Sequence, residues 1–222
     1  MTGDGHAELI GLTTNGYVYV YDVFNQVLVW KSTGLDGGGQ DLEVADIDHD
    51  GKSEIVVATG NRLYVFRRTS SGGVAYLETA NAAWNPGYFY YPIDILVADT
   101  DGDGPDEIYA LTGDKINVYG PALQSLGQVT LAGTATALAL EESALPRKNL
   151  LVSMQASDPA NYYTSNAASR IKAVDPRNGA DVWESPLLNG TFGHNGLQLV
   201  DSDGDGKLEI VFAGIGGMFR TR

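Results

Sequence analysis

Three segments of the chain repeat one acidic pattern: DIDHDGKSEI from Asp46, DTDGDGPDEI from Asp99 and DSDGDGKLEI from Asp201. Each segment places carboxylates at positions 1, 3, 5 and 9, glycine at position 6 and isoleucine at position 10. Alternate residues of an extended or turning loop project to the same side, so the first three carboxylates can converge on one point. The glycine permits a sharp reversal that brings back the fourth. Three sharp acidic turns, each leading into an apolar strand, therefore constrain the fold.

The composition of these loops is typical of a cage for a hard cation. Ca²⁺ takes roughly six to eight oxygen ligands, so the backbone carbonyl of position 7 and water would complete the shell. Without a cation, carboxylates ~5 Å apart repel by roughly 3 kcal/mol per pair at an effective dielectric near 20. We therefore predict about three structural Ca²⁺ ions per chain. The predicted ligands are Asp46, Asp48, Asp50, Lys52 and Glu54; Asp99, Asp101, Asp103, Pro105 and Glu107; and Asp201, Asp203, Asp205, Lys207 and Glu209.

Two other kinds of loop share part of this pattern. A solvated acidic turn could explain any single copy, because Asp and Gly favour turns for conformational reasons alone. Three copies in register argue against it. An EF-hand loop opens in the same way but closes with Glu at position 12 and continues as a helix. Here position 12 is Val57, Ala110 or Phe212, and the residues that follow have the composition of a strand.

The overall composition predicts an all-β protein. At 222 residues and 43% hydrophobic content the chain can bury a sizeable core, and its 28 glycines and 12 tyrosines accompany many short β-branched and aromatic runs. Three bound Ca²⁺ ions, each carrying two positive charges, would reduce the formal charge of −14 to −8. No basic patch is present, so a nucleic-acid partner is disfavoured.

The expected compartment is extracellular, either secreted or at the cell surface. The chain has no cysteine, so disulfides cannot stabilise it, whereas Ca²⁺ sites with Kd of about 0.1 mM would be largely filled at ~1 mM Ca²⁺. Each such site contributes ~1.4 kcal/mol, and three contribute ~4 kcal/mol. No apolar transmembrane stretch is visible, so we expect no membrane insertion. The first ten residues also lack a basic and apolar leader, as expected of a mature piece.

A longer repeat appears when the loop glutamates serve as markers. The first ten residues match the second half of a loop, with Asp4 and Glu8 at positions 5 and 9, and a degenerate copy places Glu141 and Asn149 at positions 1 and 9. Short apolar runs around each marker predict four antiparallel strands per repeat, the unit of a β-propeller blade. The single domain or propeller segment, residues 1–222, would then comprise about five blades: 1–35, 36–80, 81–128, 129–188 and 189–222.

The acidic loop followed by EI and small residues resembles the FG-GAP/VCBS repeats of integrin α-subunit propellers and of many secreted bacterial proteins. The third copy has the fullest pattern, with Phe192-Gly193 ahead of it and FAG at 212–214 where GAP is expected. The resemblance covers essentially the whole chain. It implies a calcium-binding propeller, which we expect to be a module for adhesion or recognition of a protein or glycan ligand. The first repeat lacks its entry strand and the last lacks its fourth strand, so we expect either a ring of about five blades or an arc of a larger propeller. An arc would expose strand edges, through which the end blades could self-associate.

We expect no enzymatic activity, because no catalytic constellation is evident. His6, His49 and His194 are scattered, and the chain contains neither a cysteine nucleophile nor a GxSxG turn. A paired-carboxylate hydrolase stays open, since Asp and Glu are plentiful. Two alternatives to the binding module also stay open: a fragment of a carbohydrate-active enzyme, such as the polysaccharide lyases with a similar calcium-rich propeller, and a structural subunit assembling through incomplete end blades.

Two further segments are candidate ligand surfaces. The aromatic segment WNPGYFYYP, 84–92, could stack on sugar rings, although it continues into a strand and core packing is an equal expectation. The polar loop SDPANYYTSNAAS, 157–169, is the second candidate, since loops on a rigid scaffold often carry function.

Overall fold

Strands make up all the regular structure that the computed structural model of the chain describes. No helix among the described residues is long and apolar enough to cross a membrane. The described residues are 6–69, 76–84, 93–141, 148–155, 168–190, 192–214 and 217–221.

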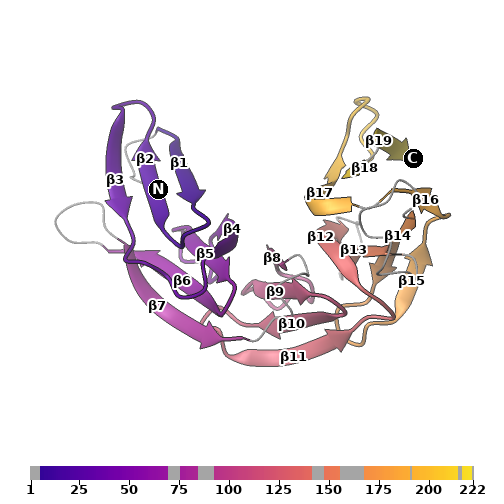
Figure 1. Cartoon of the computed structure of the whole chain (residues 1–222), viewed down its shortest axis with the longest axis horizontal. Coiled ribbons are helices and arrows are strands. Elements are labelled where there is room, and N and C mark those ends of the chain that lie inside the picture. The colour runs from indigo at the N-terminus through magenta and orange to yellow at the C-terminus, as the bar shows by residue number, and fades with distance from the viewer. Residues whose placement is uncertain are drawn as a thin grey trace.

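Five antiparallel sheets follow one another along the chain and form an open arc (Figure 1). The predicted all-β propeller architecture is therefore confirmed, with the blades arranged as an arc. Strands β4, β8, β12 and β17 lie on the concave side of the arc (Figure 1). The sheets are β1 (Glu8–Leu12), β2 (Val18–Asp22) and β3 (Val27–Lys31); β4 (Gly39–Ala45), β5 (Glu54–Thr59), β6 (Arg62–Arg68) and β7 (Tyr76–Ala83); β8 (Ile93–Ala98), β9 (Glu107–Thr112), β10 (Lys115–Tyr119) and β11 (Ser125–Thr130); β12 (Ala135–Glu141), β13 (Asn149–Gln155), β14 (Ala168–Val174) and β15 (Asp181–Glu184), with β16 (Leu188–Asn189) paired to β14; and β17 (Phe192–Val200), β18 (Glu209–Gly214) and β19 (Gly217–Thr221).

The strand that leaves each of the first two acidic loops is buried on both faces. Every residue of β5 and of β9 is buried, which explains why EIVVAT and EIYALT are continuous apolar runs without polar alternation. In β5, Ile55 and Val57 face the first sheet, whereas Val56 and Ala58 face the third. A blade is therefore one layer of a stack, with neighbours on both sides.

The described residues form four apolar clusters, each lying between two neighbouring sheets. Between the first two, the Trp30 ring packs against Phe66 and Tyr76, with ring centroids 5.6 and 5.1 Å apart. In the cluster between the last two, the Phe192 and Phe212 rings of the last sheet meet edge to face at 4.7 Å. Fully burying one such side chain contributes ~1.5–3 kcal/mol, so these interfaces hold the arc together.

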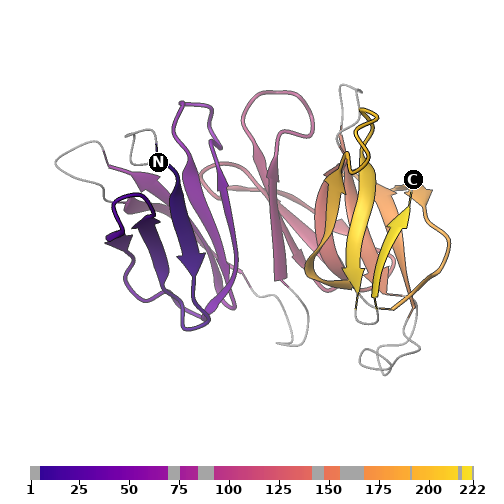
Figure 2. The ribbon, with the colours of Figure 1, turned by 90° about the horizontal axis from the view of Figure 1, so that it is seen from above.

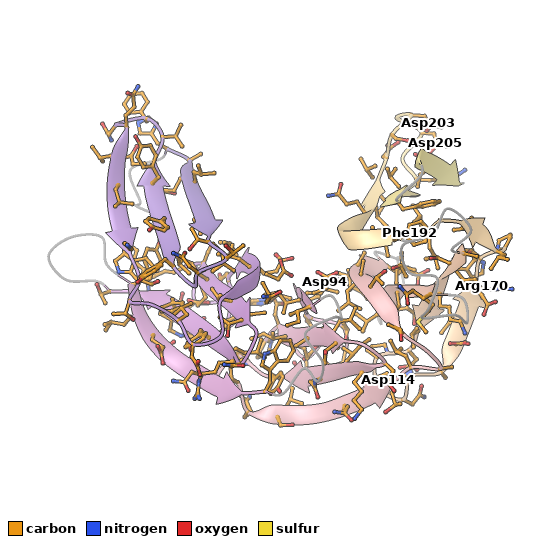
Figure 3. The ribbon with its side chains drawn as sticks, viewed as in Figure 1. Asp94, Asp114, Arg170, Phe192, Asp203 and Asp205 are labelled. Carbon is orange, nitrogen blue, oxygen red and sulfur yellow. The ribbon has the colours of Figure 1, made fainter. Side chains whose placement is uncertain are left out.

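Buried aspartates connect the inner strands of successive blades. The Asp41 carboxylate on β4 accepts a hydrogen bond of 2.8 Å from the Ile95 N–H on β8, and the Asp94 carboxylate on β8 accepts one of 2.7 Å from the Leu138 N–H on β12. Strands β8 and β12 are edge strands of their sheets, so these N–H groups have no ladder partner on that side. Figure 3 shows Asp94 on the inner side of the arc.

Candidate metal centres

The three acidic loops join β4 to β5, β8 to β9 and β17 to β18, and they lie along the same rim of the arc (Figure 2). Figure 3 shows Asp203 and Asp205 at the tip of the third loop. Each loop connects the innermost strand of its sheet to the next strand. The repeat in the sequence is therefore a repeat in space.

The aspartate at position 1 organises the backbone of each loop. Its carboxylate accepts hydrogen bonds from backbone N–H groups at positions 4 to 6, so the chain wraps around that side chain. The distances are 2.9 and 2.8 Å from Asp50 and Gly51 to Asp46, 2.6 and 3.3 Å from Gly102 and Gly104 to Asp99, and 2.6, 3.1 and 2.9 Å from Gly204, Asp205 and Gly206 to Asp201.

Two positions of each loop adopt left-handed backbone geometry. Position 6 is glycine, as the turn requires, with φ of 85° at Gly51 and 117° at Gly104. Position 4 is also left-handed, and here the first loop differs, since His49 has φ of 57° where the other loops have Gly102 and Gly204. The repeated DGDG of the second and third loops is the sequence signal of this second left-handed position.

The glutamate at position 9 closes each loop. One of its carboxylate oxygens accepts a hydrogen bond from the backbone N–H of position 2, and the glutamate itself is buried. In the second and third loops a hydroxyl side chain at position 2, Thr100 or Ser202, donates to the same oxygen at 3.4 and 2.6 Å. The backbone distances are 3.1 Å from Ile47 to Glu54, 3.1 Å from Thr100 to Glu107 and 2.9 Å from Ser202 to Glu209.

The carboxylate oxygens converge to different degrees in the three loops. In the second loop one oxygen from each of the four predicted acids lies within 4.8 Å of the others. The first loop gathers its three aspartates without Glu54, and the third gathers its acids without Asp205. A donor set of carboxylate oxygens fits a hard cation. The position-7 carbonyls of Lys52, Pro105 and Lys207 remain predicted ligands. The converging groups are Asp46, Asp48 and Asp50; Asp99, Asp101, Asp103 and Glu107; and Asp201, Asp203 and Glu209.

Burial raises the pKa of the closing glutamate in two loops. For Glu107, desolvation raises the pKa of the carboxyl, the hydrogen bond from the Thr100 N–H lowers it, and the charge of Asp101 raises it again. For Glu54, desolvation again raises the pKa, against the attraction of the Arg67 guanidinium. Burial thus disfavours the negative form of both side chains, and only Glu54 has a guanidinium that opposes this effect.

Arg67 on β6 is a contact that the sequence reasoning missed. Its guanidinium forms an ion pair with Asp48 and lies 3.7 Å from the Glu54 carboxylate. Lys52 also pairs with Asp50, at 3.1 Å, on the exposed side of the loop. The Arg67 contact could have been suspected only from the strand register, because Ile55 pairs with Phe66 and Arg67 therefore stands opposite Glu54.

Backbone hydrogen bonds link neighbouring loops along the rim. The Asp106 N–H donates to the Ile47 carbonyl at 3.1 Å, and the Lys148 N–H donates to the Thr100 carbonyl at 3.2 Å. Both donors are at position 8 and both acceptors at position 2, which supports the alignment of the degenerate fourth copy. In that copy the Asn149 amide donates to the Glu141 carboxylate at 2.5 Å, so an internal hydrogen bond joins positions 1 and 9.

The structure describes only part of the other candidate segments predicted from the sequence. Trp84 is buried in the cluster between the second and third sheets, and its indole N–H donates to the Thr59 carbonyl at 2.9 Å, so this ring packs in the core. The rest of that segment, 85–92, and most of the polar loop, 157–167, lie outside the described residues, as does Asp4. The exposed His49 imidazole lies 3.3 Å from Asp106 of the next loop.

A cavity of about 500 Å³ lies among the inner strands β4, β8, β12 and β17. Its lining includes Glu43, Asp94, Leu96, Leu138 and Leu199. Burial raises the pKa of the Glu43 carboxyl, the charge of Asp41 raises it further, and the hydrogen bond from the Val44 N–H opposes both.

The raised pKa of Glu43 predicts that this residue destabilises the fold as the pH rises. A folded chain that holds the proton more tightly than the unfolded chain gains stability below the ordinary glutamate value of 4.5. That gain is lost as the pH rises through the raised pKa. We therefore expect Glu43→Gln to be more stable relative to the parent chain at pH 7 than at pH 4.5, as measured by urea unfolding at fixed Ca²⁺. The same substitution at exposed Glu78 is the control, and an equal difference at both pH values would refute the expectation.

Comparison with known proteins supports the fold and the repeat. Residues 46–110, which include the first two acidic loops, match the family of FG-GAP-like repeats. No curated protein matches the chain. The structure is similar to that of Saccharomyces cerevisiae Sqt1, with a TM-score of 0.62 and 15% identity over 96% of this chain and 54% of that one. Two structures of BBS1N in complex with ARL6DN are also similar. The one soaked with mercury gives a TM-score of 0.62 and 12% identity over 96% of this chain and 55% of that one. The one soaked with lead gives a TM-score of 0.61 and 14% identity over 98% of this chain and 60% of that one.

These three neighbours are β-propeller proteins, and the chain spans little more than half of their length. At such low identity the likeness concerns the fold alone. The resemblance drawn from the acidic loops is confirmed by the family match. The chain is thus an arc of β-propeller blades that carries an FG-GAP-like repeat in residues 46–110.

Proposed function

We propose that the chain is an extracellular calcium-binding propeller module that recognises a protein or glycan ligand, with calcium in a structural role. One observation carries the calcium part of the proposal: the convergence of four carboxylates in the second loop within 4.8 Å of one another. Asp99, Asp101, Asp103 and Glu107 would hold the ion there, and the ion would neutralise their mutual repulsion.

The recognition part rests on the architecture and on the family resemblance. The acidic loops share one rim of a scaffold whose blades are packed through four apolar clusters (Figure 2). Loops held on a rigid framework often carry binding function. The acidic loops also resemble the FG-GAP repeats of integrin α-subunit propellers. In this proposal Ca²⁺ fixes the shape of the rim, and residues beside the loops contact the ligand.

Calorimetric titration with Ca²⁺ tests the metal proposal at a single loop. We expect Asp103→Asn to remove or weaken by at least tenfold the binding of one ion, because it removes one of the four converging charges while keeping the size of the side chain. Asp114→Asn, the same change in the turn between β9 and β10, should bind like the parent chain; Figure 3 shows Asp114 on the outer side of the arc. No measurable heat from the parent chain would exclude the calcium role. Binding to immobilised glycans and extracellular proteins, with and without Ca²⁺, tests recognition.

A further inference from the structure

The first and second loops differ in what neutralises their carboxylates. In the first loop the Arg67 guanidinium pairs with Asp48 and lies 3.7 Å from the Glu54 oxygen that does not bind the Ile47 N–H. Among the residues that the structure describes, no lysine or arginine pairs with the four acids of the second loop.

The difference follows from the residue opposite the closing glutamate. In the second sheet Ile55 pairs with Phe66, so Arg67 stands opposite Glu54. In the third sheet Ile108 pairs with Tyr119, so the next residue, Gly120, stands opposite Glu107. A β-carbon at Gly120 would lie 2.0 Å from the Gln124 amide nitrogen, so Gln124 already fills that place. In the last sheet Ile210 pairs with Thr221, so the residue opposite Glu209 is residue 222, which lies outside the described residues.

The Arg67 side chain is well placed to act as a cation of the protein itself. Its exposed fraction is 29% and that of the paired Asp48 side chain is 31%, so solvent screens the pair less than it would a fully exposed one. A guanidinium stays charged at every physiological pH. Its two carboxylate partners, Asp48 and Glu54, are both predicted ligands of this loop.

We propose, building on the calcium function above, that Arg67 is a built-in cation of the first loop: it orders this loop without metal and weakens its binding of Ca²⁺. A Ca²⁺ ion that takes Glu54 and Asp48 as ligands must displace the guanidinium or bear its repulsion. The second loop has no such competitor among the described residues. The repeats are alike in sequence, yet one loop is compensated by the chain and the other depends on metal.

A calcium titration measures the competition. In a background that disables the other two loops (Asp101→Asn, Asp103→Asn, Asp203→Asn and Asp205→Asn), Arg67→Met should bind Ca²⁺ at least tenfold more tightly than the same chain with Arg67. The control is Arg62→Met, which removes the same charge from the other end of β6, where Arg62 contacts Asn81; it should leave the affinity unchanged. Equal affinities for Arg67→Met and its background would overturn the proposal.

A melting experiment in EDTA tests the ordering effect independently of metal binding. With all other residues native, Arg67→Met should melt several degrees below the parent chain in EDTA and recover in millimolar Ca²⁺, whereas Arg62→Met should show no such recovery. A parent-like melting temperature of Arg67→Met in EDTA would refute the ordering role. If the parent chain bound no Ca²⁺ at any loop, the calcium function would fail, and this EDTA comparison would still decide whether Arg67 orders the loop.

Discussion

We expect EDTA to lower the melting temperature of the chain by about 5–10 °C relative to 1 mM Ca²⁺. A site with Kd of about 0.1 mM contributes ~1.4 kcal/mol at that concentration. The second and third loops would together contribute ~3 kcal/mol. For a chain of 222 residues, each kcal/mol shifts the melting temperature by roughly 2–4 °C. Calorimetric or circular-dichroism melting measures the shift.

Two controls make the chelation result specific to the loops. Mg²⁺ at the same concentration should restore less stability, because it demands a smaller octahedral shell and gives up its water reluctantly. The double variant Asp101→Asn, Asp203→Asn should lose most of its response to Ca²⁺. Identical melting curves in EDTA and in millimolar Ca²⁺ would contradict the structural role of the ion.

We expect Asp94→Ala to reduce the free energy of unfolding by about 3 kcal/mol. The Asp94 side chain is 1% exposed and accepts the hydrogen bond from the Leu138 N–H on the next blade. Alanine leaves that buried N–H without this acceptor, and a hydrogen bond to a charged group contributes ~1.5–3 kcal/mol before the cost of the unpaired donor is counted. Urea unfolding at saturating Ca²⁺ measures the loss.

The isosteric variant Asp94→Asn separates the hydrogen bond from the packing of the side chain. Asparagine keeps a carbonyl oxygen at the acceptor position, so it should lose about 1 kcal/mol. Asp114→Ala, at an exposed turn of the same blade, should change stability by less than about 0.5 kcal/mol. Parent-like unfolding of Asp94→Ala would show that the inter-blade hydrogen bond does not stabilise the arc.

Much of the fold was predictable because its signals are local. The apolar runs after each acidic loop, such as EIVVAT, indicate buried strands, and the spacing of the loop glutamates indicates a blade repeat. The position-1 aspartates and position-6 glycines likewise act within a few residues of their own place in the chain. The backbone geometry of the loops is therefore largely predictable from the sequence.

The features that were missed depend on contacts between distant residues. The buried Asp41 and Asp94 accept hydrogen bonds from residues 54 and 44 positions further along the chain, on the next blade. Arg67 reaches the first loop only through the register of β5 and β6. Trp84 looked available to a sugar, but its burial depends on the third sheet packing over it. No local pattern encodes such contacts.

The placement of the apolar clusters has a consequence for how the arc comes apart. Each cluster joins two neighbouring sheets only, so stability is approximately a sum of blades and nearest-neighbour interfaces, as in a linear array. Among the described residues, the β17–β19 sheet contributes to one cluster and the β8–β11 sheet to two. Opening the β8–β11 sheet therefore disrupts two apolar interfaces at once, so the β8–β9 loop lies on a sheet that is held from both sides.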